Sequence, residues 1–111
     1  YNKINLSLDT FPFPGVTTSL ESMLMGVPVL TMNGFNFSSR FGVTINKNID
    51  MLDFIATNYD DYIYIAKKLS KDHELHTKNG IKLREKVIKS SLFDTKKFAK
   101  DFEKILKEVL N

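Results

Sequence analysis

A group of residues near the start of the chain has the types and spacing of an anion-binding site. Residues 12–21 read Pro-Phe-Pro-Gly-Val-Thr-Thr-Ser-Leu-Glu, so two threonines follow a glycine where a helix can begin. The first N–H groups of a helix lack internal partners and carry partial positive charge, which suits a phosphate. Gly15 lets the backbone approach such a ligand closely, and the hydroxyls of Thr17 and Thr18 can donate to its oxygens.

Glu21 extends this pattern by one helical turn. It lies four residues after Thr17 and three after Thr18, which places all three on one helix face. Its carboxylate can accept two hydrogen bonds from a ribose diol one sugar away from the phosphates. A more frequent use of such residues is helix capping, in which Thr17 is the N-cap and Glu21 a capping-box acid. The spacing alone leaves both interpretations open.

Other chemistries find little support in the sequence. Cysteine is absent, which excludes disulfides and thiolate chemistry. His73 and His76 stand three residues apart with Glu74 between them, and no carboxylate is placed to complete a metal site. The chain contains neither a glycine-flanked serine elbow nor the two common glycine-rich phosphate fingerprints. We therefore expect no metal.

Composition indicates one ordinary globular domain. The 111 residues are 42% hydrophobic and 26% charged, and no stretch approaches the roughly 20 apolar residues of a membrane span. The net charge of +3 comes from the second half, where lysines alternate with acids. This mixed pattern favours solvated helix faces and argues against nucleic acid or membrane as a partner.

The first half predicts strand, loop, helix and strand. Residues 4–8 alternate as a half-buried strand does, and residues 27–32 are an apolar run typical of a parallel strand covered on both faces. Between them, Thr17 or Thr18 can start a helix that Gly26 ends as its C′ residue. Two strands joined by such a helix form a right-handed βαβ unit.

Residues 33–56 are less regular. Ser38 or Ser39 is expected to start a short helix through Ile45, and residues 52–56 are expected to form a short terminal strand. We predict a Rossmann-like part over residues 1–56, which carries the nucleotide-binding loop, and C-terminal helices of the same domain over residues 57–111.

Three helices are predicted in the second half. The first begins after Asn58 and has an inward face of Tyr59, Tyr62, Ile63, Ala66 and Leu69. The second spans residues 72–89, with Leu75, Leu83 and Val87 inward and Gly80 as a weak point. The third follows Asp94, and its broad apolar stripe, expected to dock on the core, contains Phe98, Phe102, Ile105, Leu106, Val109 and Leu110.

Short stretches along almost the whole chain follow one order. They read Leu-Asp-Thr-Phe-Pro at 8–12, Gly-Val-Thr-Thr at 15–18, Met-Gly-Val-Pro-Val-Leu-Thr at 25–31, Ser-Ser-Arg at 38–40, Phe-Ile-Ala at 54–56 and Ser-Leu-Phe-Asp at 91–94. Together these stretches resemble the C-terminal catalytic region of the O-linked N-acetylglucosamine transferases and their SPINDLY-like and bacterial relatives. Arg40 falls in the Ser-Arg pair and is expected to pair with an acid such as Asp9 or Asp50.

The resemblance implies a glycosyltransferase of the GT-B arrangement, with two Rossmann-like domains behind tetratricopeptide repeats. Such enzymes transfer a sugar from a UDP-sugar, here UDP-N-acetylglucosamine, to Ser or Thr hydroxyls of proteins, with inversion and without a metal or other cofactor. The chain opens with Tyr1 and not with Met, and the strand pattern of Ile4, Leu6 and Leu8 begins almost at once, so we expect a C-terminal fragment of such an enzyme. The family's general base and its uracil contacts belong to upstream sequence.

The resemblance also assigns the candidate residues. The family loop that matches residues 15–18 reads Gly-His-Thr-Thr and holds the UDP diphosphate, which gives this role to Gly15, Val16, Thr17 and Thr18. Val16 replaces the histidine and removes a donor near the diphosphate. Glu21 matches the family's ribose-binding acid with a longer carboxylate than the usual aspartate.

These observations predict an α/β fold with a partial Rossmann-like parallel sheet, the C-terminal part of a GT-B nucleotide-binding domain, followed by C-terminal helices. The expected function is UDP-sugar-dependent transfer to protein by a cytoplasmic parent enzyme, with the fragment alone inactive. The alternative is a noncatalytic α/β module that binds a protein through its sheet edge or terminal helix, with the threonines and Glu21 serving only as caps.

Overall fold

Three short parallel strands form the sheet of the computed structural model, which describes residues 1, 3–72 and 79–111. They are β1 (Ser7–Leu8), β2 (Val29–Met32) and β3 (Ile55–Ala56), and they lie side by side in that order. Ser7 is in register with Val29, and Thr31 is in register with Ile55. Helix α1 (Thr17–Leu24) connects β1 to β2, so the predicted parallel strand–helix–strand unit is confirmed.

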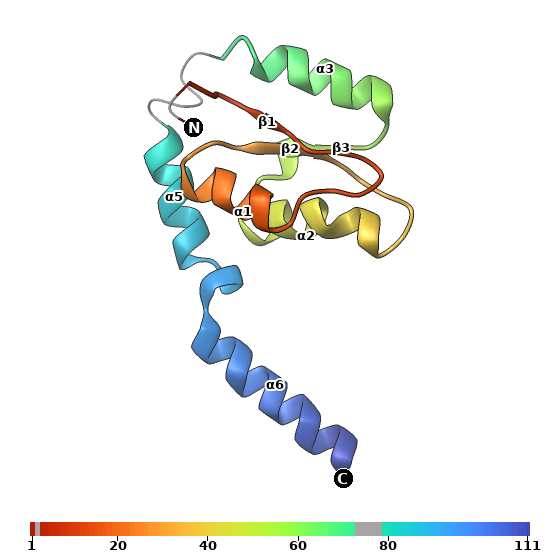
Figure 1. Cartoon of the computed structure of the whole chain (residues 1–111), viewed down its shortest axis with the longest axis vertical. Coiled ribbons are helices and arrows are strands. Elements are labelled where there is room, and N and C mark those ends of the chain that lie inside the picture. Colours follow the sequence, from red (N-terminus) through yellow and green to blue (C-terminus); the bar gives the residue numbers. More distant parts are fainter. Residues whose placement is uncertain (2, 73–78) are drawn as a thin grey trace.

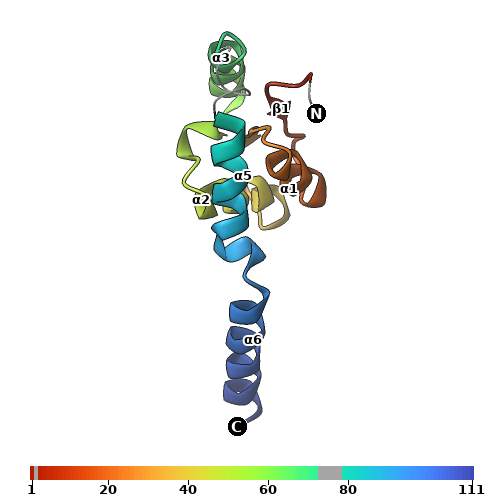
Figure 2. The same cartoon turned by 90° about the vertical axis from the view of Figure 1, so that its left-hand side faces the viewer.

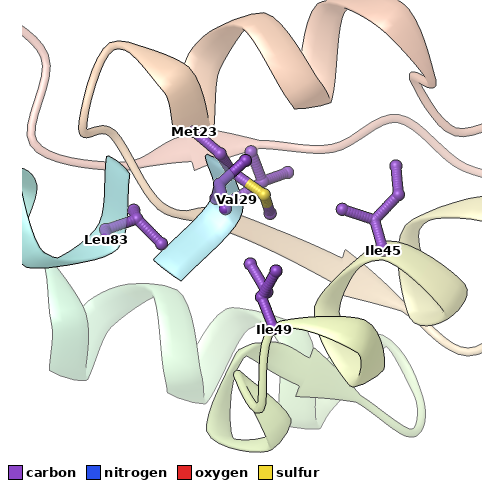
Figure 3. Close-up of a cluster of buried hydrophobic side chains, with 6 residues drawn as sticks. Met23, Val29, Ile45, Ile49 and Leu83 are labelled. Carbon is purple, nitrogen blue, oxygen red and sulfur yellow. The ribbon is translucent and has the colours of Figure 1, made fainter. Parts of the chain in front are cut away.

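Helices cover both faces of this sheet (Figure 1). All four residues of the central strand β2 are buried, as its continuous apolar run predicts. On one face Val29 joins a cluster with Met23, Ile45, Ile49, Leu83 and Val87 (Figure 3), contributed by α1, α2 (Phe41–Asn48) and its C-terminal end, and α5 (Asn79–Lys89). On the other face Leu30, Met32 and Ala56 pack against α3 (Tyr59–Leu69).

Two glycines bring α1 and α5 into backbone contact. Gly26 ends α1 with φ +80°, and the bonds from Gly26 N–H to Met23 O and from Val27 N–H to Ser22 O form a Schellman motif. A Cβ on Gly26 would lie 2.9 Å from the carbonyl oxygen of Gly80. Gly80 is buried and lets the helices cross closely, and its role as a weak point of the helix stays a prediction. The part of the expected helix over residues 73–78, with Leu75, lies outside the described residues.

The last helix, α6 (Thr95–Leu110), extends away from the rest of the molecule (Figures 1 and 2). Asp94 caps it as predicted, because its carboxylate accepts a hydrogen bond from Lys97 N–H. None of its residues is buried, and Phe98 is 67% exposed. The radius of gyration is 15.5 Å, above the about 13 Å of a compact domain of this length. The expected docking of its apolar stripe onto the core is wrong.

Smaller departures have local causes. Pairing in the first strand is limited to Ser7–Leu8, and a turn with a hydrogen bond from Ile4 N–H to Tyr1 O precedes it. A 3₁₀ turn, η2 (Leu52–Phe54), takes up the first part of the strand expected over residues 52–56. The short helix expected near Ser38 is present as η1 (Ser38–Arg40) followed by α2. A further 3₁₀ turn, η3 (Ser91–Phe93), joins α5 to α6.

Helix α3 contacts the sheet with part of its expected inward face. Asn58 caps it as predicted, through a hydrogen bond from Asp61 N–H. Tyr62 and Ala66 pack on the sheet as predicted, together with Ile65. Tyr59 and Ile63, expected inward, are 68% and 50% exposed. The Tyr62 hydroxyl lies 2.8 Å from Asp9 O, to which it donates, and 3.4 Å from Leu30 O. No helix within the described ranges is long and apolar enough to cross a bilayer.

Candidate functional site

Asp9 organises the loop between β1 and α1. It follows β1 directly, and its Oδ1 accepts hydrogen bonds from Gly15 N–H at 2.7 Å and from Thr10 N–H at 3.1 Å. Its Oδ2 accepts a bond from the Thr31 hydroxyl on β2 at 2.8 Å. The Thr10 hydroxyl donates to Phe13 O at 2.6 Å. The loop is thus fixed by polar contacts at the carboxyl edge of the sheet, where open α/β folds bind ligands.

Helix α1 begins at this loop without a side-chain cap. Val16 is its N-cap residue, so Thr17 and Thr18 occupy its first two positions. The first turn contains no acid, because Glu21 lies beyond it. Within the described part of the chain, neither threonine hydroxyl makes a hydrogen bond, and both residues are exposed. The capping alternative for Thr17 and Glu21 is therefore wrong, and the two hydroxyls face solvent beside the unpaired N–H groups of the first turn.

A polar hollow of about 170 Å³ lies against the start of α1. It is lined by Tyr1, Ser7, Leu8, Asp9, Thr10, Gly15, Thr18, Ser19 and Ser22. Gly15 and Thr18 of the predicted site line it, whereas Val16, Thr17 and Glu21 lie outside its wall. Among the described residues no lysine or arginine lines it, so neutral donors of this part of the chain would have to hold an anion there.

Gly15 lies close to two side chains of the first turn of α1. A Cβ at this position would lie 2.5 Å from Thr18 Oγ1 and 2.7 Å from Ser19 Oγ, both closer than real Cβ contacts. The absence of a side chain therefore brings the loop backbone next to two hydroxyls of the first helical turn. The close approach of the Gly15 backbone to a bound phosphate stays a prediction.

Val16 and Glu21 are on the solvent side of the same region. Val16 is 40% exposed and leaves its side of the loop without a polar side chain. Glu21 is exposed one turn into α1, and in the described ranges its carboxylate has no hydrogen-bond or ion-pair partner. Its acceptors are available to a ligand that reaches beyond the helix start.

Sequence reasoning missed Asp9 and Ser19 as parts of the site. Asp9 carried one usable signal, since it is an acid at the carboxyl end of a strand and before a loop. Ser19 is only 4% exposed and lines the hollow, but in the sequence it is one more polar residue in a first turn. The contact of Asp9 with Thr31 spans 22 residues, and no local pattern predicts it.

Arg40 does not make the predicted ion pair. Its Nε donates to Gly34 O at 2.7 Å and closes the loop after β2. The Asp9 carboxylate is held by Gly15, Thr10 and Thr31, and Asp50 lies 3.9 Å from Lys86 Nζ. The expected pairing of Arg40 with Asp9 or Asp50 is wrong, because a backbone carbonyl takes the place of the acid.

Tyr62 connects helix α3, on the opposite face of the sheet, to this site. Its hydroxyl donates to the backbone oxygen of Asp9, so α3 supports the residue that organises the loop. Burial raises the pKa of Tyr62, and the negative charge of Asp9 raises it further. The phenol therefore stays protonated and remains a donor over the neutral pH range.

Two further features bear on other kinds of site. Among the described residues no three acidic or histidine side chains gather as metal ligands, and His73 and His76 lie outside them. An apolar hollow of about 280 Å³ lies beside α5, with Lys82 and Lys86 among its lining residues. The walls of the two hollows have no described residue in common, so this hollow belongs to a different part of the molecule.

Comparison with known proteins identifies relatives over almost the whole chain. Residues 2–102 match the family described as glycosyl transferase family 41. A protein of Eustoma exaltatum subsp. russellianum, named "Probable UDP-N-acetylglucosamine--peptide N-acetylglucosaminyltransferase SPINDLY", is 39% identical over 103 residues, which are 93% of this chain and 11% of that protein. A protein of the same name from Solanum lycopersicum is 37% identical over 98% of this chain and 12% of its own length.

A solved structure agrees with these sequence relatives. A mutant of the Thermobaculum terrenum O-GlcNAc transferase superposes with a TM-score of 0.86 at 30% identity, over 97% of this chain and 21% of its own. The present chain therefore spans about a tenth of the curated relatives and about a fifth of the solved chain.

Proposed function

The chain belongs to glycosyl transferase family 41, and on this premise we propose that it is the C-terminal part of the nucleotide-binding domain of an inverting glycosyltransferase. The donor of the full-length enzyme is a UDP-sugar, UDP-N-acetylglucosamine, and the acceptor is a Ser or Thr hydroxyl of a protein. The names of the relatives, which include this donor and a peptide acceptor, support the assignment.

The observation that carries the proposal is the uncapped start of α1. In the described chain the hydroxyls of Thr17 and Thr18 have no hydrogen-bond partner, and no side chain caps the start of the helix. Thr18 lines a polar hollow at the carboxyl edge of the sheet. We assign the UDP diphosphate to these donors, with Gly15 and Val16 forming the adjacent backbone. Glu21, one turn further, accepts hydrogen bonds from the ribose diol.

These groups act on the leaving group. In an inverting transfer the acceptor oxygen forms a bond to the anomeric carbon while the bond from that carbon to the β-phosphate oxygen breaks. The bonding electron pair stays on UDP, and the acceptor's proton passes to a base. Fixed N–H and O–H donors stabilise the negative charge that develops on the β-phosphate. We assign the base, the uracil contacts and the acceptor site to the rest of the full-length enzyme.

The remaining parts of the proposal concern that enzyme. It comprises a second Rossmann-like domain and tetratricopeptide repeats, works in the cytoplasm, and uses neither a metal nor another cofactor. The 111-residue chain alone transfers no sugar, because a GT-B active site lies between two domains. Sugar transfer by the purified chain would contradict this part of the proposal.

UDP titration of the full-length protein tests the binding site. We expect saturable binding that inorganic diphosphate competes for. The variant Glu21→Gln keeps the size of the side chain but removes acceptor capacity toward the ribose. It should therefore lower the affinity for UDP and leave the affinity for inorganic diphosphate unchanged. Failure of the full-length protein to bind UDP would contradict the proposal and favour the noncatalytic protein-binding module.

A further inference from the structure

Asp9 is placed to control where α1 begins. Its backbone is fixed from two sides, since its N–H donates to Leu30 O at 2.9 Å and its carbonyl oxygen accepts from the Tyr62 hydroxyl at 2.8 Å. Its side chain is fixed by the Thr31 hydroxyl, which donates to Oδ2 at 2.8 Å. The other oxygen, Oδ1, is thereby held in one position relative to β2 and α3.

Asp9 Oδ1 binds the loop just before the helix. Oδ1 accepts from Gly15 N–H at 2.7 Å, and Gly15 lies two residues before the first residue of α1. Gly15 in turn lies against Thr18 and Ser19, so closely that a Cβ would collide with both hydroxyls. A continuous set of contacts thus runs from β2 through Asp9 and Gly15 to the first turn of α1.

The same geometry argues against a direct role for Asp9 in binding an anion. Both of its carboxylate oxygens accept hydrogen bonds from the protein. A carboxylate offers no donor to a phosphate and repels its charge. The site requires that Asp9 supply a hydrogen-bond acceptor to Gly15 N–H at a defined position.

We propose that Asp9 is a positioning residue, and this inference rests on the proposed function. By holding Gly15, Asp9 orients the N–H and O–H donors of the first turn of α1 toward the diphosphate, without touching the nucleotide. The requirement is for hydrogen-bond acceptance at a fixed distance and not for charge. An asparagine can meet it, because its amide oxygen accepts from Gly15 and Thr10, and its amide group can donate to the Thr31 hydroxyl. A glutamate keeps the charge but moves both oxygens one carbon further.

The experiment compares three variants of the full-length protein, Asp9→Asn, Asp9→Glu and Asp9→Ala. The affinities for UDP and for uridine are measured by calorimetric titration, and melting is recorded for each variant. We expect Asp9→Asn to bind UDP within about threefold of the unmodified protein, and Asp9→Glu and Asp9→Ala to bind it at least about tenfold more weakly. Uridine affinity should stay unchanged, because the loop contacts only the phosphates.

Each contrary outcome has a distinct meaning. A loss in Asp9→Asn as large as in Asp9→Glu would show that charge or direct contact matters and would overturn the inference. Equal losses for UDP and uridine would indicate a merely structural role and would also overturn it. If Asp9→Ala does not fold, the difference in UDP affinity between Asp9→Asn and Asp9→Glu still tests the inference.

The same titrations separate this inference from the proposed function. Normal UDP binding by Asp9→Glu and Asp9→Ala, together with weakened binding by the Thr17→Val, Thr18→Val double variant, would overturn the role of Asp9 alone. No UDP binding by the unmodified protein would overturn both.

Discussion

The start of α1 and the whole of α6 obtain their structure in opposite ways. Helix α6 has a side-chain cap and three ion pairs within its own length, joining Lys97 to Asp101, Glu103 to Lys107 and Lys104 to Glu108. No residue of α6 is buried. The start of α1 has no side-chain cap, and its position comes from Asp9, Gly15 and the strand residue Thr31.

This difference separates local from long-range determinants. A helix such as α6 can be predicted from caps and periodicity, because both are local properties. A site such as the start of α1 depends on contacts between residues far apart in sequence. Clear periodicity shows that a helix has an apolar face, but it does not show what covers that face.

The largest expected effect comes from one substitution made in two helices. Val87 in α5 is fully buried, whereas Val109 in α6 is 77% exposed. Val87→Ala should lower the free energy of unfolding of the 111-residue chain by about 2 kcal/mol, because it removes buried methyl groups and leaves a cavity. Val109→Ala should change it by less than about 0.5 kcal/mol.

Thermal or urea unfolding of both variants measures the contrast. Equal losses in the 111-residue chain would show that α6 is packed, contrary to the structure. A large loss for Val109→Ala only in the full-length protein would show that another part of that protein covers the stripe.

A smaller effect is expected at Tyr62, which connects α3 to the site. Tyr62→Phe removes the bond to Asp9 O and should cost about 1 kcal/mol at neutral pH. Burial and the charge of Asp9 raise the pKa of Tyr62 in the folded state. Its stabilising contribution is therefore complete below the unfolded pKa of about 10 and is lost as pH rises through the folded value.

Unfolding of the unmodified chain and of Tyr62→Phe, measured from pH 7 to pH 11, isolates this contribution. The difference in stability between the two should shrink only above about pH 10. A difference that stays constant across this range would mean that the phenol does not titrate as described.

The sequence was a good guide where a residue's role is local or where both faces of a strand are covered. The apolar run that contains β2, the C′ role of Gly26, and the caps Asn58 and Asp94 are all confirmed. The inward face of α3 was predicted only in part. Tyr62 and Ala66 pack on the sheet as expected, but Ile65 takes the place expected for Ile63, because residues on either side of Tyr62 fit an apolar stripe equally well.

The site was predictable only in part, for the same physical reason. The loop and helix start could be found from glycine and threonine spacing and from the family resemblance. The role of Asp9 depends on its contact with Thr31, which is distant in sequence. The buried position of Gly80 depends in the same way on the close approach of Gly26. Neither contact can be read from the sequence. The sequence could not show whether Thr17 caps the helix or leaves its hydroxyl free, since threonine is common in both roles.

The most direct test of the central claim is the double variant Thr17→Val, Thr18→Val in the full-length protein, with UDP affinity and melting measured on the same samples. Valine keeps the shape of threonine and removes two donors to a charged ligand. UDP affinity should fall by at least about tenfold, while the free energy of unfolding changes by less than about 0.5 kcal/mol. Unchanged UDP affinity, with about 1 kcal/mol lost from stability, would contradict the account and restore the capping interpretation.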